Sequence, residues 1–139
     1  MPLPEKIDLE IVTPEGLLFH DDVDELVAPG KEGYFGVRPG HTPLLAALGM
    51  GILSYRRGEA WHDLTCFWGW CEVLPDRVSV LASLGERAED IDVGRAEAAL
   101  KAAEERMKRI RAEDDYEEVR GAWARAVTRV GAARKQRDR

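Results

Sequence analysis

The residues most able to do chemistry in this chain are its two cysteines and three histidines. Cys66 and Cys71 follow His62, and thiolate and imidazole groups are common ligands of zinc. Their spacing matches no standard zinc pattern, and residues 66 and 71 would point to opposite faces of an uninterrupted strand. His20 and His41 form no recognisable nucleophile–base–acid group with nearby acids, although such groups assemble in space rather than in sequence. A metal site and an enzyme therefore remain minor alternatives.

The composition indicates a globular protein without a membrane span. Hydrophobic residues make up 45% and charged residues 33% of the 139 residues, as is typical of globular domains. No stretch approaches the roughly 18 consecutive apolar residues of a spanning helix, and the N-terminal residues lack the pattern of a secretory signal. Two cysteines make no disulfide framework, which favours a reducing compartment. We expect any role at a membrane to depend on an embedded partner.

The charge is divided unevenly along the chain. Residues 1–100 contain 8 Lys and Arg against 18 Asp and Glu, a balance of −10, and residues 101–139 contain 12 against 8, a balance of +4, which together give the net charge of −6. A basic tail on an acidic body is expected to dock on that body or to reach an acidic partner. We expect no nucleic-acid partner, because the basic residues are interleaved with glutamates and lack accompanying surface aromatic residues.

The chain up to about Leu84 has the pattern of short β-strands separated by turns. Ile7, Leu9 and Ile11 alternate with more polar positions, as in a half-buried strand. Proline and glycine turn signals recur through this region. Further candidate strands are Val23 to Ala28, Ile52 to Arg56, Trp61 to Phe67, Trp70 to Leu74 and Val78 to Leu84. Many short strands without intervening helices predict an antiparallel β-sandwich.

From Asp90 onward the apolar residues recur at helical spacing. Asp92 is a candidate N-cap for a first helix, and the acidic run 113–115 can cap a second one. The expected apolar faces consist of Ala96, Ala99, Leu100, Ala103, Met107 and Ile110, then of Tyr116, Val119, Trp123, Ala126, Val127 and Val130. Two helices joined by a short polar link predict a helical hairpin. The fold class is therefore α+β in two parts, a β-sandwich followed by a helical hairpin.

The predicted hairpin has little apolar area to bury. Its faces are rich in alanine, which contributes less than leucine at about 25 cal/mol per Å². Gly121 and Gly131 each weaken the second helix by roughly 0.5–1 kcal/mol relative to alanine. A hairpin of this kind can stay helical while it detaches from the sandwich. A permanently packed hairpin with small residues is the alternative interpretation.

Ordered motifs along the chain resemble those of the epsilon subunits of F-type ATP synthases, called delta in mitochondria. The motifs are Val12-Thr13-Pro14-Glu15-Gly16, the specific segment from Glu32 to Leu45 with Gly36-Val37-Arg38-Pro39-Gly40-His41-Thr42-Pro43-Leu44-Leu45, then Glu72 to Pro75, Val78 to Ala82 and Glu86 to Ala96. The resemblance covers essentially the whole chain. It implies a sandwich domain of about ten strands over residues 1–88 and a two-helix regulatory domain over residues 89–139.

The resemblance implies a non-catalytic rotor subunit of the central stalk. The sandwich would bind the gamma subunit and the ring of membrane-embedded c subunits, at the cytoplasmic face of the bacterial inner membrane. The hairpin would lie folded on the sandwich or extend along gamma toward the alpha and beta subunits, where it would inhibit ATP hydrolysis. The alternative is a free β-sandwich adaptor with a nucleotide-sensing helical tail. The chain has no Gly-x-x-x-x-Gly-Lys-Ser/Thr loop, so we expect no hydrolysis by the chain itself.

Four residues are implied to contact the c-ring, namely Glu32, Tyr34, Arg38 and His41. They belong to a segment shaped by glycine and proline, and such loops commonly carry recognition residues. A solvated turn is the alternative interpretation. Many bacterial relatives have an acid at the position of Tyr34, so we expect a contact that is more aromatic and less charged.

Two tryptophans mark a second departure from the family pattern. Trp68 and Trp70 stand where relatives usually have small residues and paired glycines. The two side chains either enlarge an apolar contact with gamma or fill the core of the sandwich.

The resemblance also implies ATP as a regulatory ligand on the folded hairpin, with no other cofactor. Some bacterial epsilon subunits bind ATP through an Ile/Leu-Asp-x-x-Arg-Ala motif. The residues that match this site are Glu86, Ile91, Asp92, Arg95, Ala96, Arg125 and Arg129. The two C-terminal arginines are four residues apart, so they share a helix face and can jointly meet phosphates. Another phosphate-side arginine is replaced by Ala102, so we expect weak binding. Alternatively, Asp92 only caps its helix and the arginines form a solvated face.

Overall fold

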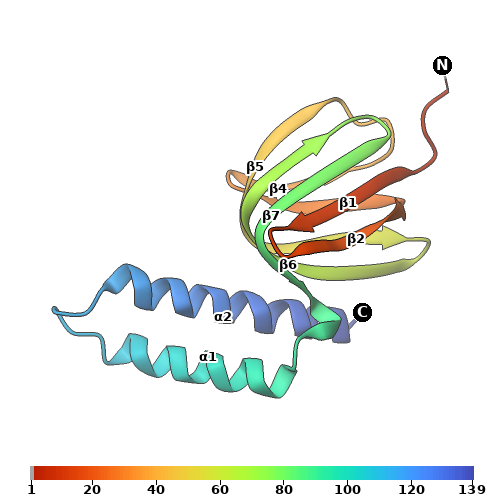
Figure 1. The fold of residues 1–139 in the computed structure, drawn as a ribbon. Helices are drawn as coiled ribbons and strands as arrows, with labels where there is room; N and C mark the ends of the chain where they lie inside the picture. Colours follow the sequence, from red (N-terminus) through yellow and green to blue (C-terminus); the bar gives the residue numbers. More distant parts are fainter. Residues whose placement is uncertain (1) are drawn as a thin grey trace.

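The alternating residues near the start of the chain do form a strand in the computed structural model, which describes residues 2–139. Ile7, Leu9 and Ile11 are buried and the residues between them are partly exposed. The seven strands of the sandwich are β1 (Ile7–Thr13), β2 (Gly16–Val23), β3 (Glu25–Gly30), β4 (Gly33–Val37), β5 (Leu44–Arg57), β6 (Ala60–Val73) and β7 (Arg77–Arg87). The predicted sandwich followed by a helical hairpin is confirmed (Figure 1).

The strands form one continuous sheet that curls around the core (Figure 1). Their order is β2-β1-β7-β6-β5-β3-β4. Five of the six neighbouring pairs are antiparallel, as predicted, but β1 pairs with β7 in parallel. The sheet is therefore mixed. The parallel pair joins the first and last strands of the sandwich, so residues from its two ends in sequence lie side by side within the sheet.

The strands are fewer and longer than the expected ten. β5 and β6 have 14 residues each, and β6 combines the two strands predicted at 61–67 and 70–74. At Trp68 (φ 62°) and Gly69 (φ 143°) the alternation of inward and outward side chains along β6 reverses, so this one strand looks like two strands in the sequence. The segment 33–37 was predicted as part of a loop and forms β4 instead. β2 and β4 are largely exposed, and therefore show no clear apolar alternation.

Both helices begin at the predicted capping residues. A short 3-10 helix, η1 (Ala88–Asp90), leads into α1 (Val93–Lys108), which is followed by α2 (Tyr116–Arg137). Asp92 accepts a hydrogen bond from the Arg95 amide at 3.0 Å. Asp115 accepts one from the Glu118 amide at 3.2 Å. These bonds satisfy amide groups that have no partner within the helix.

The hairpin lies against one end of the sandwich, with α2 between α1 and the sheet (Figure 1). α2 contacts β6 and β5, and α1 packs chiefly on α2. A small buried cluster joins these elements. Its members are Ala88, Ile91, Ala96, Val130, Ala132 and Ala133, with Ile52, Val93 and Leu100 packed against them. Four of the six buried members are alanine, which agrees with the predicted alanine-rich seam. No helix among residues 2–139 is both long and apolar enough to cross a membrane.

Candidate functional site

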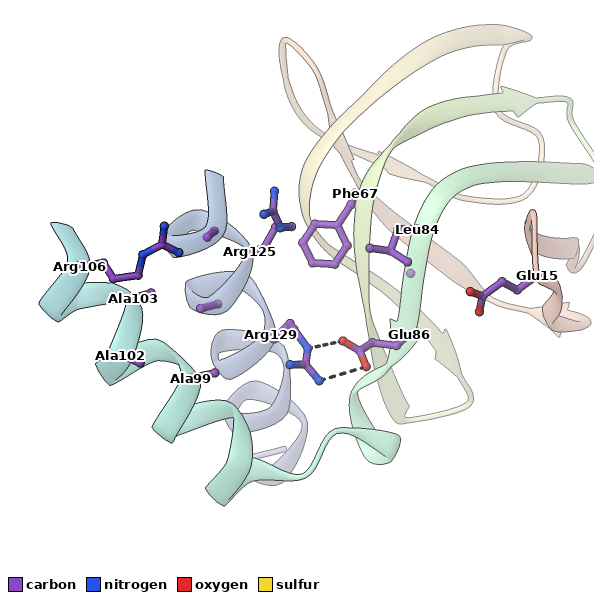
Figure 2. Close-up of a pocket in the computed structure, with 13 residues that line it drawn as sticks. Glu15, Phe67, Leu84, Glu86, Ala99, Ala102, Ala103, Arg106, Arg125 and Arg129 are labelled. Carbon is purple, nitrogen blue, oxygen red and sulfur yellow. Dashed lines mark hydrogen bonds and ion pairs between the residues drawn. The ribbon is translucent and has the colours of Figure 1, made fainter. Parts of the chain in front are cut away.

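A cavity of about 680 Å³ lies between the sandwich and the hairpin (Figure 2). Its walls are largely apolar on the helical side, where alanines from both helices line it. Its charged groups come from both parts of the molecule. The lining residues are Glu15, Phe67, Leu84, Gly85, Glu86, Ala99, Ala102, Ala103, Arg106, Ala122, Arg125, Ala126 and Arg129. A cavity with an apolar body and several guanidinium groups suits an anionic ligand with an apolar portion.

An ion pair across this cavity joins the two parts of the molecule. Arg129 of α2 donates from Nε to Oε1 of Glu86 at 2.5 Å and from Nη2 to Oε2 at 3.4 Å (Figure 2). Both side chains are about one-third exposed. A bidentate arginine–carboxylate pair is stronger than a single hydrogen bond. In this structure Arg129 is therefore engaged by Glu86, and an anionic ligand would compete for it.

Two further guanidinium groups line the cavity (Figure 2). Arg125 lies one turn before Arg129 on α2, and one of its guanidinium nitrogens lies near Gly121, where a Cβ atom would approach it to 3.3 Å. Gly121 thus leaves room for this side chain. Arg106 of α1 also lines the cavity and was not predicted. Its position four residues after Ala102 places both residues on one helix face, and this spacing was visible in the sequence.

The structure brings only part of the predicted ATP-binding set into the cavity. Glu86, Arg125 and Arg129 line it, whereas the residues of the Ile-Asp-x-x-Arg-Ala motif do not. Ile91 and Ala96 are buried in the adjoining alanine-rich cluster. Asp92 caps α1, and Arg95 is exposed. The motif therefore holds the start of α1 in place, and the predicted residues that do face the cavity come from β7 and α2.

The four residues predicted to contact the c-ring do not form one cluster. Glu32 lies in the turn before β4 and Arg38 follows its end, so about 20 Å of strand separates them at roughly 3.3 Å per residue. Tyr34 is 60% exposed, and its hydroxyl accepts a hydrogen bond from the Ile52 amide at 3.0 Å. The ring of His41 hydrogen-bonds the carbonyl of the next residue at 2.6 Å.

Arg38 is largely exposed and is held by an acid of the neighbouring strand. Its Nε donates to Glu25 of β3 at 3.3 Å. Glu25 also accepts from Arg56 of β5 at 3.2 Å. This pair belongs to a partly buried ionic group of the sandwich, at the end of β4 away from Glu32.

Both tryptophans lie on the surface, which rules out core filling. Trp68 is 52% and Trp70 is 55% exposed. Trp70 pairs across the sheet with Leu81 of β7, which is also exposed. A Cβ atom on Gly69 would lie 2.0 Å from the Leu81 carbonyl oxygen, so only glycine fits between them. The change of direction at Trp68 and Gly69 thus turns a tryptophan pair outward.

The same change of direction brings both cysteines into the core of the sandwich. Cys66 and Cys71 were predicted to face opposite sides, but both are buried in the main cluster because the alternation of β6 reverses between them. Burial raises the pKa of Cys66 to about 11 and that of Cys71 to about 12. His62 instead stacks on Tyr55, with ring centroids 5.0 Å apart. Among residues 2–139 no three His, Cys, Asp or Glu side chains group as metal ligands would.

The fold defines a class of two-part proteins, in which a β-sandwich carries a helical hairpin. Two family models match this chain: the β-sandwich domain of the ATP synthase delta/epsilon chain over residues 6–88, and its long α-helix domain over residues 89–134. The chain is 43% identical to ATP synthase epsilon chain 2 of Syntrophotalea carbinolica, over 94% of this chain and 96% of that relative. It is 44% identical to the ATP synthase epsilon chain of Syntrophobacter fumaroxidans, over 96% and 99%.

Solved structures agree on the fold. A chain of the cryo-EM structure of the Euglena gracilis mitochondrial ATP synthase matches with a TM-score of 0.76 at 22% identity, over 97% of this chain and 83% of that chain. A chain of the Tetrahymena thermophila mitochondrial ATP synthase central stalk and c-ring matches with a TM-score of 0.59 at 16% identity, over 96% and 98%. The chain belongs to the ATP synthase delta/epsilon family. It is a non-catalytic subunit of that enzyme.

Proposed function

We propose that this chain is the rotor subunit that connects gamma to the c-ring, and that its hairpin restrains ATP hydrolysis. The observation that carries the proposal is the contrast between a sandwich with a core of its own and a hairpin attached through a small cluster and a cavity. The sandwich has the rigidity that a torque-bearing anchor needs. The hairpin has the weak attachment that a movable element needs. The proposed location is peripheral, at the cytoplasmic face of the bacterial membrane.

The sandwich carries exposed apolar side chains suited to a protein partner. Trp68, Trp70 and Leu81 are each more than half exposed on β6 and β7. Exposed tryptophans are enriched at protein interfaces, where they supply much of the binding free energy. We assign this surface to gamma. The exposed turn with Glu32 and the exposed Tyr34 are then the candidates for the c-ring contact.

The charge of the hairpin supports its inhibitory role. Residues 101–139 carry a balance of +4 on a chain of net charge −6. A detached hairpin would be attracted to acidic loops of the alpha and beta subunits. Attraction between exposed charges is screened by salt, so inhibition should weaken as ionic strength rises.

The cavity supports ATP as the ligand of the folded hairpin. Arg106, Arg125 and Arg129 would surround a polyphosphate, and the alanine-lined wall would accept an apolar portion of the nucleotide. Arg106 would supply a positive charge one turn away from Ala102. Because a ligand in this cavity contacts both parts of the molecule, it would favour the folded placement and thereby activity.

Removal of the hairpin tests the inhibitory role. In an ATP synthase carrying this chain truncated after Asp90, ATP hydrolysis should rise while assembly and coupled synthesis stay largely intact. Co-purification of gamma, alpha, beta and c subunits with the full-length and truncated chains reports assembly. Unchanged hydrolysis in an assembled enzyme would remove the inhibitory role and leave the anchor role standing. Failure to co-purify would favour a free adaptor.

A calorimetric titration of the full-length chain tests the ligand. ATP should bind weakly, and Arg129→Ala should reduce the affinity about tenfold or more, because each charge-assisted hydrogen bond contributes about 1.5–3 kcal/mol. Arg120→Ala is a matched control, since this arginine of α2 does not line the cavity. Absence of heat, together with unchanged chemical shifts around Arg125, would refute the ATP proposal.

A further inference from the structure

The carboxylate of Asp63, a residue of β6, is buried at a place outside the cavity. Its side chain has no exposed surface, and it lies on the face of β6 that carries α2. An unpaired charge in such a place is very unfavourable. The hydroxyl of Ser54, on the neighbouring strand, donates to Oδ1 at 2.6 Å, but a neutral donor does not balance the charge. The balancing group comes from the hairpin.

Arg139 supplies that charge. Its Nε donates to Oδ2 and its Nη2 to Oδ1 of Asp63, each at 2.9 Å. The guanidinium carbon lies 5.2 Å from the centre of the Trp61 ring, within cation–π range. About three-quarters of the Arg139 side chain is covered. This is a bidentate pair at a site closed to solvent on the carboxylate side.

Gln136 adds a second contact at the same place. β7 stops pairing with β6 at Leu64, so the backbone of β6 beyond that residue lacks a strand neighbour there. The side-chain amide of Gln136 occupies the vacant edge. Its oxygen accepts from the Asp63 amide at 2.6 Å, and its nitrogen donates to the Trp61 carbonyl at 3.0 Å. The last turn of α2 therefore satisfies backbone groups of the sandwich that would otherwise face α2 without partners.

The electrostatics of Asp63 agree with this geometry. Burial raises the pKa of its carboxyl, but hydrogen bonds from Arg139 and Ser54 and the charges of Arg139 and Lys135 outweigh burial and hold the pKa below its ordinary value. The carboxylate is therefore charged at neutral pH in the folded chain. Gln136 and Arg139 lie beyond residues 89–134, which the helical family model matches.

We propose that Asp63 is the receptor of a latch, formed by Gln136 and Arg139, that holds the hairpin on the sandwich whether or not the cavity holds a ligand. This inference rests on the movable hairpin of the proposed function and adds a second control to it. A ligand in the cavity can replace the contact between Arg129 and Glu86. The latch lies outside the cavity, so such a ligand does not replace it. Detachment of the hairpin exposes a buried carboxylate and an unpaired strand edge. The latch therefore biases the free chain toward the folded placement.

The test measures the distance between spin labels at Glu59→Cys and Ala112→Cys in the full-length chain without nucleotide. Cys66 and Cys71 are buried and resist labelling. Arg139→Gln and Asp63→Asn should each increase the ratio of detached to folded hairpin about tenfold or more, the effect of one charge-assisted hydrogen bond. The double variant should do little more than either single one, because both remove the same contact.

Arg137→Gln is the matched control, because among residues 2–139 this arginine pairs with no acid except the exposed, adjacent Asp138, and the substitution should leave the ratio unchanged. Val130→Asp, which places a charge in the alanine-rich cluster, should detach the hairpin by another route. If Val130→Asp detaches it while Arg139→Gln behaves like Arg137→Gln, the latch is refuted and the movable hairpin stands. If Val130→Asp also leaves the hairpin folded, the movable hairpin fails with it.

Discussion

The sandwich and the hairpin of this chain are held together by different kinds of contact. Large aliphatic side chains from several strands, such as Leu9, Leu26, Leu53 and Val80, fill the sandwich. Full burial of each such side chain contributes roughly 1.5–3 kcal/mol. The cluster between hairpin and sandwich is mostly alanine. The comparison shows how a difference in side-chain size makes the packing inside the sandwich more extensive than the packing between sandwich and hairpin.

Polar contacts give the hairpin the specificity that its small cluster lacks. Arg129 reaches Glu86 across the cavity, and Arg139 reaches Asp63 at the end of α2. Such contacts are directional, and water, salt or a ligand can replace them. The sandwich should therefore respond to changes in packing, and the hairpin to changes in charge and solution conditions.

The largest effect is expected from Gly69→Ala, which should destabilise the sandwich. The new Cβ would lie 2.0 Å from the Leu81 carbonyl oxygen, at a φ of 143° that side chains rarely adopt. Strain and overpacking together should lower the free energy of unfolding by about 3 kcal/mol or more. Urea denaturation followed by circular dichroism measures it. Gly16→Ala is the control, with a φ of 132° and nothing within 4 Å, and an equal loss there would show that strain alone explains the effect.

An intermediate effect is expected from acid, which should act on the hairpin first. The pKa of Asp63 is lowered in the folded chain relative to its ordinary 3.8. The charged pair with Arg139 therefore stabilises the folded hairpin above about pH 3.8, and this contribution is lost as the pH falls through the lower, folded value. Asp63→Asn should remove this part of the pH dependence. Amide exchange of β6 and of β1, measured between pH 6 and pH 3, separates hairpin release from unfolding of the sandwich.

The smallest effect is expected from Gly131→Ala, which should strengthen the attachment of the hairpin to the sandwich. A Cβ atom there would lie 3.6 Å from Ile52 Cδ1, an ordinary contact. A gain in helix propensity stabilises α2 in both placements, whereas the methyl group buried against Ile52 in the folded placement contributes about 0.8 kcal/mol and should increase the folded population of the hairpin a few-fold. Spin-label distances report this population. Gly94→Ala in α1 is the control, because a Cβ atom there meets only the capping Asp92, and an equal shift would exclude a role for the contact with β5.

The sequence predicted those parts of the fold whose local pattern matches their burial. β1 alternates clearly because one of its faces is buried, and both helices begin at aspartates that cap them. β2 and β4 were missed because most of their residues are exposed on both faces. The parallel pairing of β1 with β7 joins residues about 70 positions apart, and no local pattern encodes such a pairing.

The candidate site was predictable only in part for a related reason. Arg125 and Arg129 share a helix face by spacing alone, and both line the cavity. Arg106 comes from another helix, so its approach depends on how α1 packs on α2. Asp63 and Arg139 are 76 residues apart, and no local sequence pattern indicates that Asp63 is the acid that is buried and paired with an arginine. The contacts between the sandwich and the hairpin could therefore be identified only from the structure.

The change of direction at Trp68 and Gly69 has a consequence for the length of β6. Before it, Leu64 and Cys66 point into the core while Asp63 and Phe67 point toward the hairpin side. After it, Cys71 points inward and Trp70 outward. β6 keeps one register with β5 and with β7 on both sides of this joint, so loss or gain of one residue there would shift half of the strand against both neighbours and turn its side chains to the other face. Length changes that surface turns would tolerate are therefore excluded in the middle of this strand, whatever residues replace the tryptophan and glycine.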